Sequence, residues 1–450
     1  MKIALVAMSG IRVRDEELVR LGLTLPGFVE RSEVIASLPS LGLLTLAGIP
    51  NAQNVTYEYI EVEDLHKLDN PQELFDGVDA VAISSFSAQI DEAYDLADII
   101  REIRIPVILG GLHVTSVPHE AKKHADSVVI GEGELIWQEL LNDLEKKSLK
   151  DFYDGNSREF DLTQPPMPAF ELLDITKYNR LTIQTSRGCP HTCEFCASSI
   201  LLTKKYKQKP QENILAEIDK ICEIWKYPFI EFADDNTFIN HKFWKELLPE
   251  ITKRKIKWFT ETDISVADDL ELLSLMKKSG CAQVLIGFES PEIKSLKNIE
   301  IQNNWKLNQF SKFKKAIDTI QSYGISVNGC FVLGLDNQST DIFQSVFDFV
   351  QETKLHEVQI TILTPFPETP LYNRLKEEKR LINQTDWKSC TLFDINYRPQ
   401  NMTVEELSKG FKELLLKIHS PEFTLERQKN FEVFLKKYRK NISTQKRLNN

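Results

Sequence analysis

Three cysteines are the residues of this sequence best placed to do chemistry. Cys189, Cys193 and Cys196 stand at a CxxxCxxC spacing within one short segment. Thiolates this close together are typical metal ligands. A structural zinc site and a fully ligated iron–sulfur cluster each need four protein ligands. The segment supplies three, so it predicts a cluster with one open iron, at which a small molecule can bind.

Two other interpretations of the segment stay open. His191 or a distant cysteine would complete a zinc site, and three unrelated buried thiols would hold no metal. The other cysteines are scattered singly, at Cys222, Cys281, Cys330 and Cys390. Their spacing is not that of a disulfide framework, so we expect small buried side chains in a reducing compartment.

The cysteine segment lies within residues 181–365, along which strand and helix patterns alternate. The elements of this region must therefore position the cysteines. Strands are expected at Leu181–Thr185, Phe229–Ala233, Trp258–Thr262, Gln283–Phe288, Ser326–Leu333 and Glu357–Thr364, with helices between them, such as Ile214–Trp225 and Asp341–Thr353. Six βα units predict a partial (β/α)6 barrel, whose active site lies at the carboxyl ends of the strands. The cysteines follow the first strand, at that end.

Residues 1–145 alternate with a shorter period. Strands are expected at Lys2–Met8, Thr56–Val62, Ala80–Phe86, Pro106–Gly111 and Ser127–Gly131, and helices at Leu41–Ala47, Ile90–Ile103 and Glu134–Leu144. This pattern predicts a doubly wound, Rossmann-like parallel sheet. Such sheets bind ligands outside the carboxyl ends of their strands, and the turns there are rich in small residues. Their glycines allow a bulky ligand to approach the backbone.

Taken together, these motifs resemble the cobalamin-binding radical S-adenosylmethionine (SAM) enzymes. The cysteine segment resembles the radical SAM signature. The Gly-Gly-x-His turn at Gly110, the Gly-Glu-Gly-Glu turn at Gly131 and the helix start at Leu41 are similar to those of the cobalamin-binding domain. The segment from Thr364 to Tyr372 resembles the C-terminal module of hopanoid-modifying enzymes. The resemblance extends from the first strand to about residue 415.

The resemblance implies a 4Fe-4S cluster on the three cysteines, with SAM bound at the open iron and cleaved to a 5'-deoxyadenosyl radical. The implied SAM contacts are Phe195 and Leu363 at the adenine, Gly334 making room for it, Asp234 and Asp235 at the methionyl ammonium, and Glu289 at the ammonium or ribose. For each acid, a helix N-cap is the alternative role. No further catalytic residue is implied.

For cobalamin, the implied contacts are Leu41, Gly42, Ser84, Ser85, Phe86, Gly110, Gly111, His113, Gly131, Glu132 and Gly133. One feature departs from other cobalamin domains, whose Asp-x-His-x-x-Gly loop places a histidine below cobalt. No histidine precedes His66 here, so we expect that face of cobalt to lack a histidine ligand. His113 is a candidate substitute, and its alternative role is that of a hydrogen-bonding turn residue.

The predicted domains are a cobalamin-binding-like domain at 1–145, a linker at 146–180, the radical SAM barrel at 181–365 and a helical cap with a tail at 366–450. Proline residues at 165, 166 and 168 break regular structure in the linker. The cap has expected helices at Met402–His419 and Leu425–Tyr438 and is predicted to cover the barrel mouth. Its basic end is either a solvated tail or a contact to anionic lipid.

The resemblance implies methylation of an unactivated carbon in a lipid or secondary metabolite, with a flavodoxin- or ferredoxin-type electron donor. The alternatives are a non-methylating radical reaction, such as cyclisation, ring contraction or carbon–carbon coupling, and a non-catalytic cobalamin or cluster sensor. The net charge of -11 gives no electrostatic footprint for nucleic acid. Apolar runs are shorter than the roughly 20 residues that span a bilayer, so we expect a cytoplasmic enzyme without a transmembrane segment.

Overall fold

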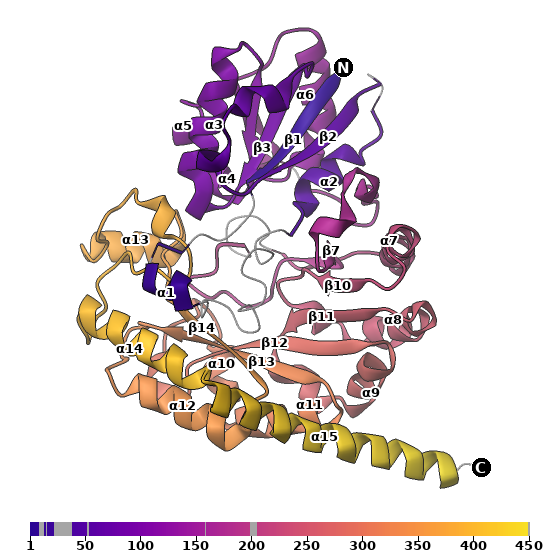
Figure 1. The fold of residues 1–450 in the computed structure, drawn as a ribbon, viewed down its shortest axis with the longest axis vertical. Coiled ribbons are helices and arrows are strands. Elements are labelled where there is room, and N and C mark those ends of the chain that lie inside the picture. The colour runs from indigo at the N-terminus through magenta and orange to yellow at the C-terminus, as the bar shows by residue number, and fades with distance from the viewer. Residues whose placement is uncertain are drawn as a thin grey trace.

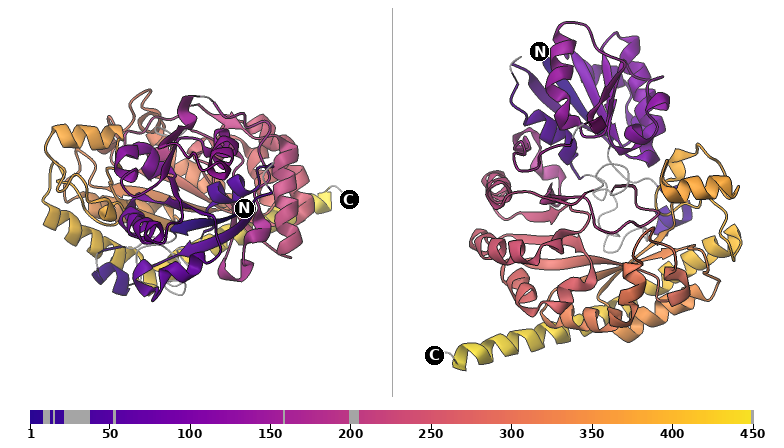
Figure 2. Two further views of the ribbon diagram at one scale, coloured as in Figure 1. Left: turned by 90° about the horizontal axis from the view of Figure 1, so that it is seen from above. Right: turned by 180° about the vertical axis from the view of Figure 1, so that it is seen from behind.

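The computed structural model describes residues 1–8, 13–14, 16–21, 38–51, 54–157, 159–198 and 205–448. It contains two six-stranded parallel sheets, the first ending at residue 154 and the second beginning at residue 181. Figure 1 shows the first sheet and its helices stacked above the second, and Figure 2 shows the same arrangement from behind. The predicted α/β class is confirmed.

The N-terminal sheet is doubly wound, as predicted. Its strand order is β2 (Thr56–Val62), β1 (Lys2–Met8), β3 (Ala80–Ser85), β4 (Val107–Gly110), β5 (Ser127–Ile130) and β6 (Phe152–Asp154). The described helices around this sheet are α2 (Leu41–Ala47), α3 (Ile90–Glu102), α4 (Leu112–Ser116), α5 (Pro118–Ala121) and α6 (Trp137–Glu145). Helix α1 (Glu16–Leu21) lies apart from them, beside α13 (Pro370–Glu377) and α14 (Val404–Ile418) (Figure 1), where Lys412 pairs with Glu17.

Strand β1 explains why helices cover both faces of this sheet. Its side chains alternate between the two faces, and both sets are buried. Even-numbered residues from Ala4 to Met8 belong to the core cluster that contains α3, and odd-numbered residues from Ile3 to Ala7 belong to the cluster that contains α6. The chain reverses its winding direction between β1 and β3, which creates the switch point where such sheets bind ligands.

Strand β6 lies within the segment predicted as a linker. Phe152 pairs with Val128 of β5, and Tyr153 is buried, with its hydroxyl donating to Asp143 at 2.8 Å. Three residues are too few to show a period of two, and the surrounding Gly, Pro, Asn and Asp residues concealed the strand. The sheet therefore extends one strand beyond the predicted set.

The second sheet is an open partial barrel, as predicted. Its order is β14 (Glu357–Ile362), β13 (Ser326–Leu333), β12 (Cys281–Glu289), β11 (Lys257–Thr262), β10 (Phe229–Phe232) and β7 (Leu181–Ile183). Its helices are α7 (Gln211–Ile224), α8 (His241–Arg254), α9 (Leu270–Lys278), α10 (Trp305–Gln309), α11 (Phe313–Ser322) and α12 (Ile342–Thr353). The ends of the predicted strands differ from these by at most two residues.

The C-terminal part contains α13 (Pro370–Glu377), α14 (Val404–Ile418) and α15 (Pro421–Leu448). Both predicted long helices are present, but they do not cover the barrel mouth. Helix α14 packs on α12, and α15 packs on α11 and then projects beyond the barrel (Figure 1). Their apolar stripes are buried against the outer helices of the barrel, which explains the difference. None of the described helices is long and apolar enough to cross a membrane.

Candidate cofactor sites

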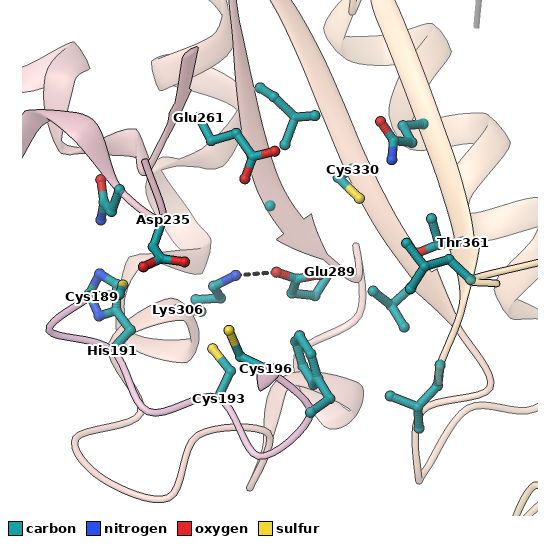
Figure 3. Close-up of a pocket in the computed structure, with 18 of the residues that line it drawn as sticks. Cys189, His191, Cys193, Cys196, Asp235, Glu261, Glu289, Lys306, Cys330 and Thr361 are labelled. Carbon is teal, nitrogen blue, oxygen red and sulfur yellow. Dashed lines mark hydrogen bonds and ion pairs between the residues drawn. The ribbon is translucent and has the colours of Figure 1, made fainter. Parts of the chain in front are cut away.

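A cavity of about 310 Å³ opens at the carboxyl ends of the barrel strands. Figure 3 shows Cys193 and Cys196 on one side of the Lys306–Glu289 ion pair, with Glu261 and Cys330 on the strands opposite. Of the residues predicted for the cluster and SAM, the cavity is lined by Cys189, Cys193, Cys196, Phe195, Asp235, Glu289 and Leu363. Residues that follow the first and the last strand of the barrel therefore meet at the carboxyl ends of the strands, as the strand-end rule predicts.

The loop that carries the three cysteines is held by contacts with other parts of the chain. Its base is the antiparallel ladder of β8 (Ser186–Arg187) and β9 (Lys207–Gln208). Between the second and third cysteines, the Glu194 amide donates to the Ile299 carbonyl at 2.9 Å. The Glu194 carboxylate accepts from Arg374 of α13 at 2.6 Å and 3.1 Å. The backbone that carries the cysteines is therefore held by the barrel and by the C-terminal part together.

The cysteine pocket has the chemistry that an iron–sulfur cluster requires. Burial raises the pKa of both the Cys189 and the Cys193 thiol to about 12, so each must release a proton when it becomes a metal ligand. Lys306 is the one lysine or arginine among the described residues that line the cavity, and its ammonium contacts Glu289. Three thiolates with a buried cation beside them fit a cluster of net negative charge.

Carboxylates dominate the opposite wall of the cavity. Asp235 accepts from the Gly188 amide at 3.1 Å. Glu261 projects into the cavity from β11 (Figure 3), and burial together with the nearby carboxylates Glu231 and Asp235 raises the pKa of Glu261 to about 8. Glu261 is therefore largely protonated at neutral pH, and Asp235 supplies the negative charge of this wall. A cationic ligand such as SAM would favour ionisation of Glu261 as well, because a nearby positive charge lowers the pKa of a carboxyl group.

Asp234 and Gly334 do not line this cavity. Asp234 is buried and accepts from the Thr185 and Ser186 amides at 2.7 Å and 2.9 Å, so its carboxylate fixes the start of the cysteine loop. Gly334 has φ +88°, and a Cβ there would lie 2.0 Å from the hydroxyl of Tyr397. Of the two aspartates predicted for the methionyl ammonium, Asp235 lines the cavity and Asp234 does not.

Glu261, Lys306 and Cys330 are among the lining residues that the sequence motifs did not single out. Glu261 is the next-to-last residue of the third barrel strand and could have been found by the strand-end rule alone. Lys306 comes from α10, and no spacing signal points to it. Cys330, expected to be a plain core residue, lies on β13 and faces the cavity. His191 also lines the cavity, but its Nε2 atom lies 3.2 Å from Asp263, and that contact does not favour the zinc interpretation.

A second cavity of about 360 Å³ lies between the N-terminal sheet and the cysteine loop. The residues predicted for cobalamin that line it are Leu41, Gly42, Ser84, Gly110, Gly111, Gly131, Glu132 and Gly133. Barrel residues complete its wall, among them Gln184, Arg187 and Asp235. Because Asp235 lines both cavities, the two sites meet at one side chain.

Two glycines in the second cavity are required by their backbone conformation. Gly111 has φ +104° and Gly131 has φ +76°, a region that other residues rarely adopt. A Cβ on Gly111 would lie 3.1 Å from Ser84 Oγ, and one on Gly131 would lie 2.3 Å from Asn156 Oδ1. The turns therefore expose bare backbone to the cavity, which fits a bulky ligand such as cobalamin.

His113, Ser85 and Phe86 do not line the second cavity. His113 is 1% exposed, its Nδ1 atom lies 2.9 Å from Ser87 Oγ, and its ring packs against Trp387. It is therefore a buried hydrogen-bonding residue, which was the alternative role, and the geometry does not place it as a cobalt ligand. Phe86 is 64% exposed, because β3 ends before it and turns its ring away from the core.

Comparisons with known proteins identify the domains that carry the two cavities. The radical SAM superfamily profile matches residues 183–350, the B12 binding domain matches residues 32–141, and a domain of unknown function (DUF4070) matches residues 369–450. TsrM from Kitasatospora setae, a radical SAM methyltransferase solved with cobalamin and a 4Fe-4S cluster, superposes with a TM-score of 0.66 at 14% identity, over 94% of this chain and 89% of TsrM. That likeness shows the shared fold.

Two relatives are carbon methyltransferases. The hopanoid C-2 methylase of Rhodopseudomonas palustris is 27% identical over 406 residues, which are 88% of this chain and 74% of the methylase. The bacteriochlorophyllide d C-8(2)-methyltransferase of Chlorobaculum tepidum is 30% identical over 372 residues, which are 78% of each chain. With its radical SAM and B12 binding domains, this chain belongs to the cobalamin-dependent radical SAM methyltransferase family.

Proposed function

We propose that the three-cysteine loop holds the 4Fe-4S cluster, that the first cavity binds SAM and that the second binds cobalamin. The observation that carries this proposal is the position of Asp235, which lines both cavities. When bound, the cluster supplies the electron that cleaves SAM, and cobalamin supplies a methyl group. Because the cavities meet at one side chain, a single substrate can reach both cofactors.

The side chains of the first cavity would bind and orient SAM through complementary charge. Asp235 and Glu289 offer carboxylates to its sulfonium and ammonium groups, and Lys306 offers an ammonium to its carboxylate. Glu261 offers a carboxyl group that would ionise beside the bound cation. Phe195 and Leu363 supply apolar surface for the adenine. These roles need no movement of the strands, because every group already faces the cavity.

We also propose a lipid or apolar secondary metabolite as substrate, which receives a methyl group on an unactivated carbon. Two named relatives methylate a hopanoid and a bacteriochlorophyllide. In this chain, Phe366 and Leu392 extend the apolar side of the first cavity beyond Leu363. A hydrocarbon substrate would exclude water from this side, where a radical must not react with solvent.

The experiment that tests the cofactor assignment is anaerobic reconstitution with iron, sulfide and hydroxocobalamin. The reduced protein is then given SAM, and 5'-deoxyadenosine and S-adenosylhomocysteine are measured by chromatography. We expect cobalamin retention and both products. Deoxyadenosine without S-adenosylhomocysteine would favour a non-methylating radical reaction, and an absence of SAM cleavage would favour a sensor.

The matched variants for this experiment are Cys193→Ala and Cys222→Ala. Cys193 is buried in the cavity, whereas Cys222 lies on α7, outside the cavity. We expect Cys193→Ala to lose at least a hundredfold in deoxyadenosine formation, because two thiolates do not hold the cluster in place. Cys222→Ala should match the wild type, and equal loss in both variants would contradict the assigned loop.

We propose a flavodoxin or ferredoxin as the physiological electron donor and the cytoplasm as the compartment. The seven free cysteines suit a reducing environment. An oxygen-sensitive cluster requires the same environment. Replacing a chemical reductant with each purified donor protein in the SAM cleavage assay tests the first proposal, and cell fractionation tests the second.

A further inference from the structure

Two basic side chains at the base of the cysteine loop form ion pairs with the N-terminal domain. In the ladder at its base, Arg187 of β8 stands opposite Lys207 of β9. Arg187 donates to Glu132 at 3.0 Å and also contacts Glu134, while the Lys207 ammonium lies 3.8 Å from Glu132. Both acids belong to the turn after β5. The two strands at the base of the cysteine loop are therefore bound, through these ion pairs, to one turn of the N-terminal domain.

This network is more than a surface salt bridge. The side chains of Arg187, Lys207, Glu132 and Glu134 are between 11% and 16% exposed. The Arg187 guanidinium also lies 5.2 Å from the ring centre of Phe160 and donates to Gln184 at 2.7 Å. A charged network with several partners and little exposure holds its geometry much better than an exposed pair.

The location of the network connects two cofactor sites. Arg187 precedes Cys189 by two residues, and Arg187, Glu132 and Glu134 all line the second cavity. Glu132 accepts the Phe160 amide at 3.0 Å as well as the Arg187 bond, so its carboxylate is committed to holding the domains together. Glu132 is also predicted to contact cobalamin, and it lines the second cavity, so these bonds add a second role to the predicted one.

On the basis of the proposed cofactor sites, we infer that Arg187, with Glu132 and Glu134, couples cobalamin binding to the formation of the cysteine cluster. Arg187 is a positioning residue. Cobalamin bound against the turn after β5 fixes the two acids, and the acids fix the base of the cysteine loop through Arg187. Because coupling is reciprocal, a cluster in the loop must strengthen cobalamin binding by the same factor.

The test is a titration of hydroxocobalamin into the full-length protein, with and without its cluster, followed by absorbance. In the wild type we expect cluster loading to lower the dissociation constant about fivefold or more, the usual range of coupling between sites. In Arg187→Met and in Glu134→Gln the two constants should become equal. A purely structural role would weaken binding in both states and leave their ratio unchanged.

Arg254→Met is the matched control. Arg254 makes a bidentate pair with Asp219 at 2.7 Å and 2.6 Å on the outside of the barrel, so its loss should leave the cobalamin ratio at the wild-type value. The charge-retaining variant Arg187→Lys should restore part of the ratio. If Arg187→Met does not fold, the isosteric Glu134→Gln variant carries the same test.

Two results would overturn the inference: equal dissociation constants in the two states of the wild type, or a wild-type ratio in Glu134→Gln. Either result leaves the proposed function intact, because cobalamin still binds. If neither form of the wild type binds cobalamin, the assignment of the second cavity fails, and the inference fails with it. The two failures are therefore distinguishable.

Discussion

Lys306 and Glu289 form a buried ion pair in the first cavity, and each charge stabilises the other. The Lys306 and Glu289 side chains are 12% and 7% exposed, and both line the cavity beside the Asp235 carboxylate. Burial disfavours the charged ammonium, but the ion pair with Glu289 outweighs it and raises the pKa of Lys306. Neither charge is stable there without the other.

We predict that Lys306→Met destabilises the cofactor-free protein by roughly 2–4 kcal/mol, because it leaves the Glu289 carboxylate buried and unpaired. The double variant Lys306→Met with Glu289→Gln should recover most of this loss, and both variants should bind SAM more than tenfold more weakly. Thermal unfolding and equilibrium dialysis of SAM give the two measurements. Equal stability of the single and double variants would contradict the pairing argument.

Gly111 and Gly42 line the same cavity but differ in backbone conformation. We predict that Gly111→Ala costs about 1–2 kcal/mol of stability, because φ +104° is strained for a side chain and the new Cβ meets Ser84 Oγ at 3.1 Å. Gly42→Ala should stabilise α2 by up to about 1 kcal/mol, since no atom lies within 4 Å of its Cβ position. Chemical denaturation of both variants checks the opposite signs.

At the scale of elements, the sequence predicted the positions of the strands well, but it did not predict the direction in which single side chains point. Strands β1 and β13 occupy the predicted residues because each is a long apolar run between clear turns. Asp234 and Asp235 both follow β10, yet one faces Thr185 and the other faces the cavity. Neighbouring residues point in opposite directions, and only the path of the chain after the strand decides which one reaches the ligand.

Other features depended on contacts that no local pattern reports. Lys306 reaches the cavity because the segment from 299 to 301 bonds to the cysteine loop and leads α10 past it. The helices α14 and α15 were found by their period, but the face they cover depends on the apolar surface of α11 and α12. Sequence patterns therefore identified the elements, and tertiary packing selected their partners.

Helix α15 is joined to the barrel through a partly buried histidine with a predictable response to acid. His356 precedes β14, stacks on Phe431 at 4.1 Å, and is bonded to Ser326 Oγ at 2.7 Å. Burial, together with the Arg427 charge, lowers the pKa of His356 to about 4, and the same causes lower that of His419 to about 4. Both rings are neutral in the folded protein at a pH where the unfolded chain is protonated.

The unfolded state therefore gains stability as the pH falls below about 6.5, by about 1.4 kcal/mol per pH unit for each histidine. We predict that the midpoint of thermal unfolding falls less steeply from pH 7 to pH 5 in His356→Asn than in the wild type. The asparagine keeps a partner for Ser326 but does not titrate. His66→Asn, at an exposed ring, should follow the wild-type curve, and identical slopes in all three proteins would contradict the argument.

At the scale of the whole molecule, the cysteine loop is the point where three parts of the chain meet. Arg187 links it to the N-terminal domain, Ile299 holds it on the barrel side, and Arg374 joins it to the C-terminal part. A second contact joins the N-terminal and C-terminal parts directly, without the barrel. Trp387 donates its indole N–H to Glu120 at 3.0 Å and packs on His113.

The Trp387 contact is built around a carboxylate that several donors share. Tyr94 donates to Glu120 at 3.2 Å, and the His113 Nε2 atom lies 3.6 Å from it. Burial raises the pKa of Glu120, but the contacts with His113 and Trp387 outweigh it, so the pKa of this carboxyl lies below its usual range. Glu120 is thus ionised whenever the two parts are docked at neutral pH.

We predict that Trp387→Ala weakens the docking of the N-terminal domain by about 3–5 kcal/mol, because it opens a cavity and removes a charge-assisted hydrogen bond. Trp387→Phe keeps most of the packing and should cost about 1–2 kcal/mol. Calorimetry should resolve two unfolding transitions in Trp387→Ala, and limited proteolysis should cut between residues 155 and 180, where the chain passes between the two sheets. A single transition in Trp387→Ala at the wild-type temperature would mean that other contacts, such as the Arg187 network, hold the domains. The stability of Trp387→Phe separates the two contributions, because a loss as large as that of alanine would assign the docking energy to the indole N–H and its bond to Glu120.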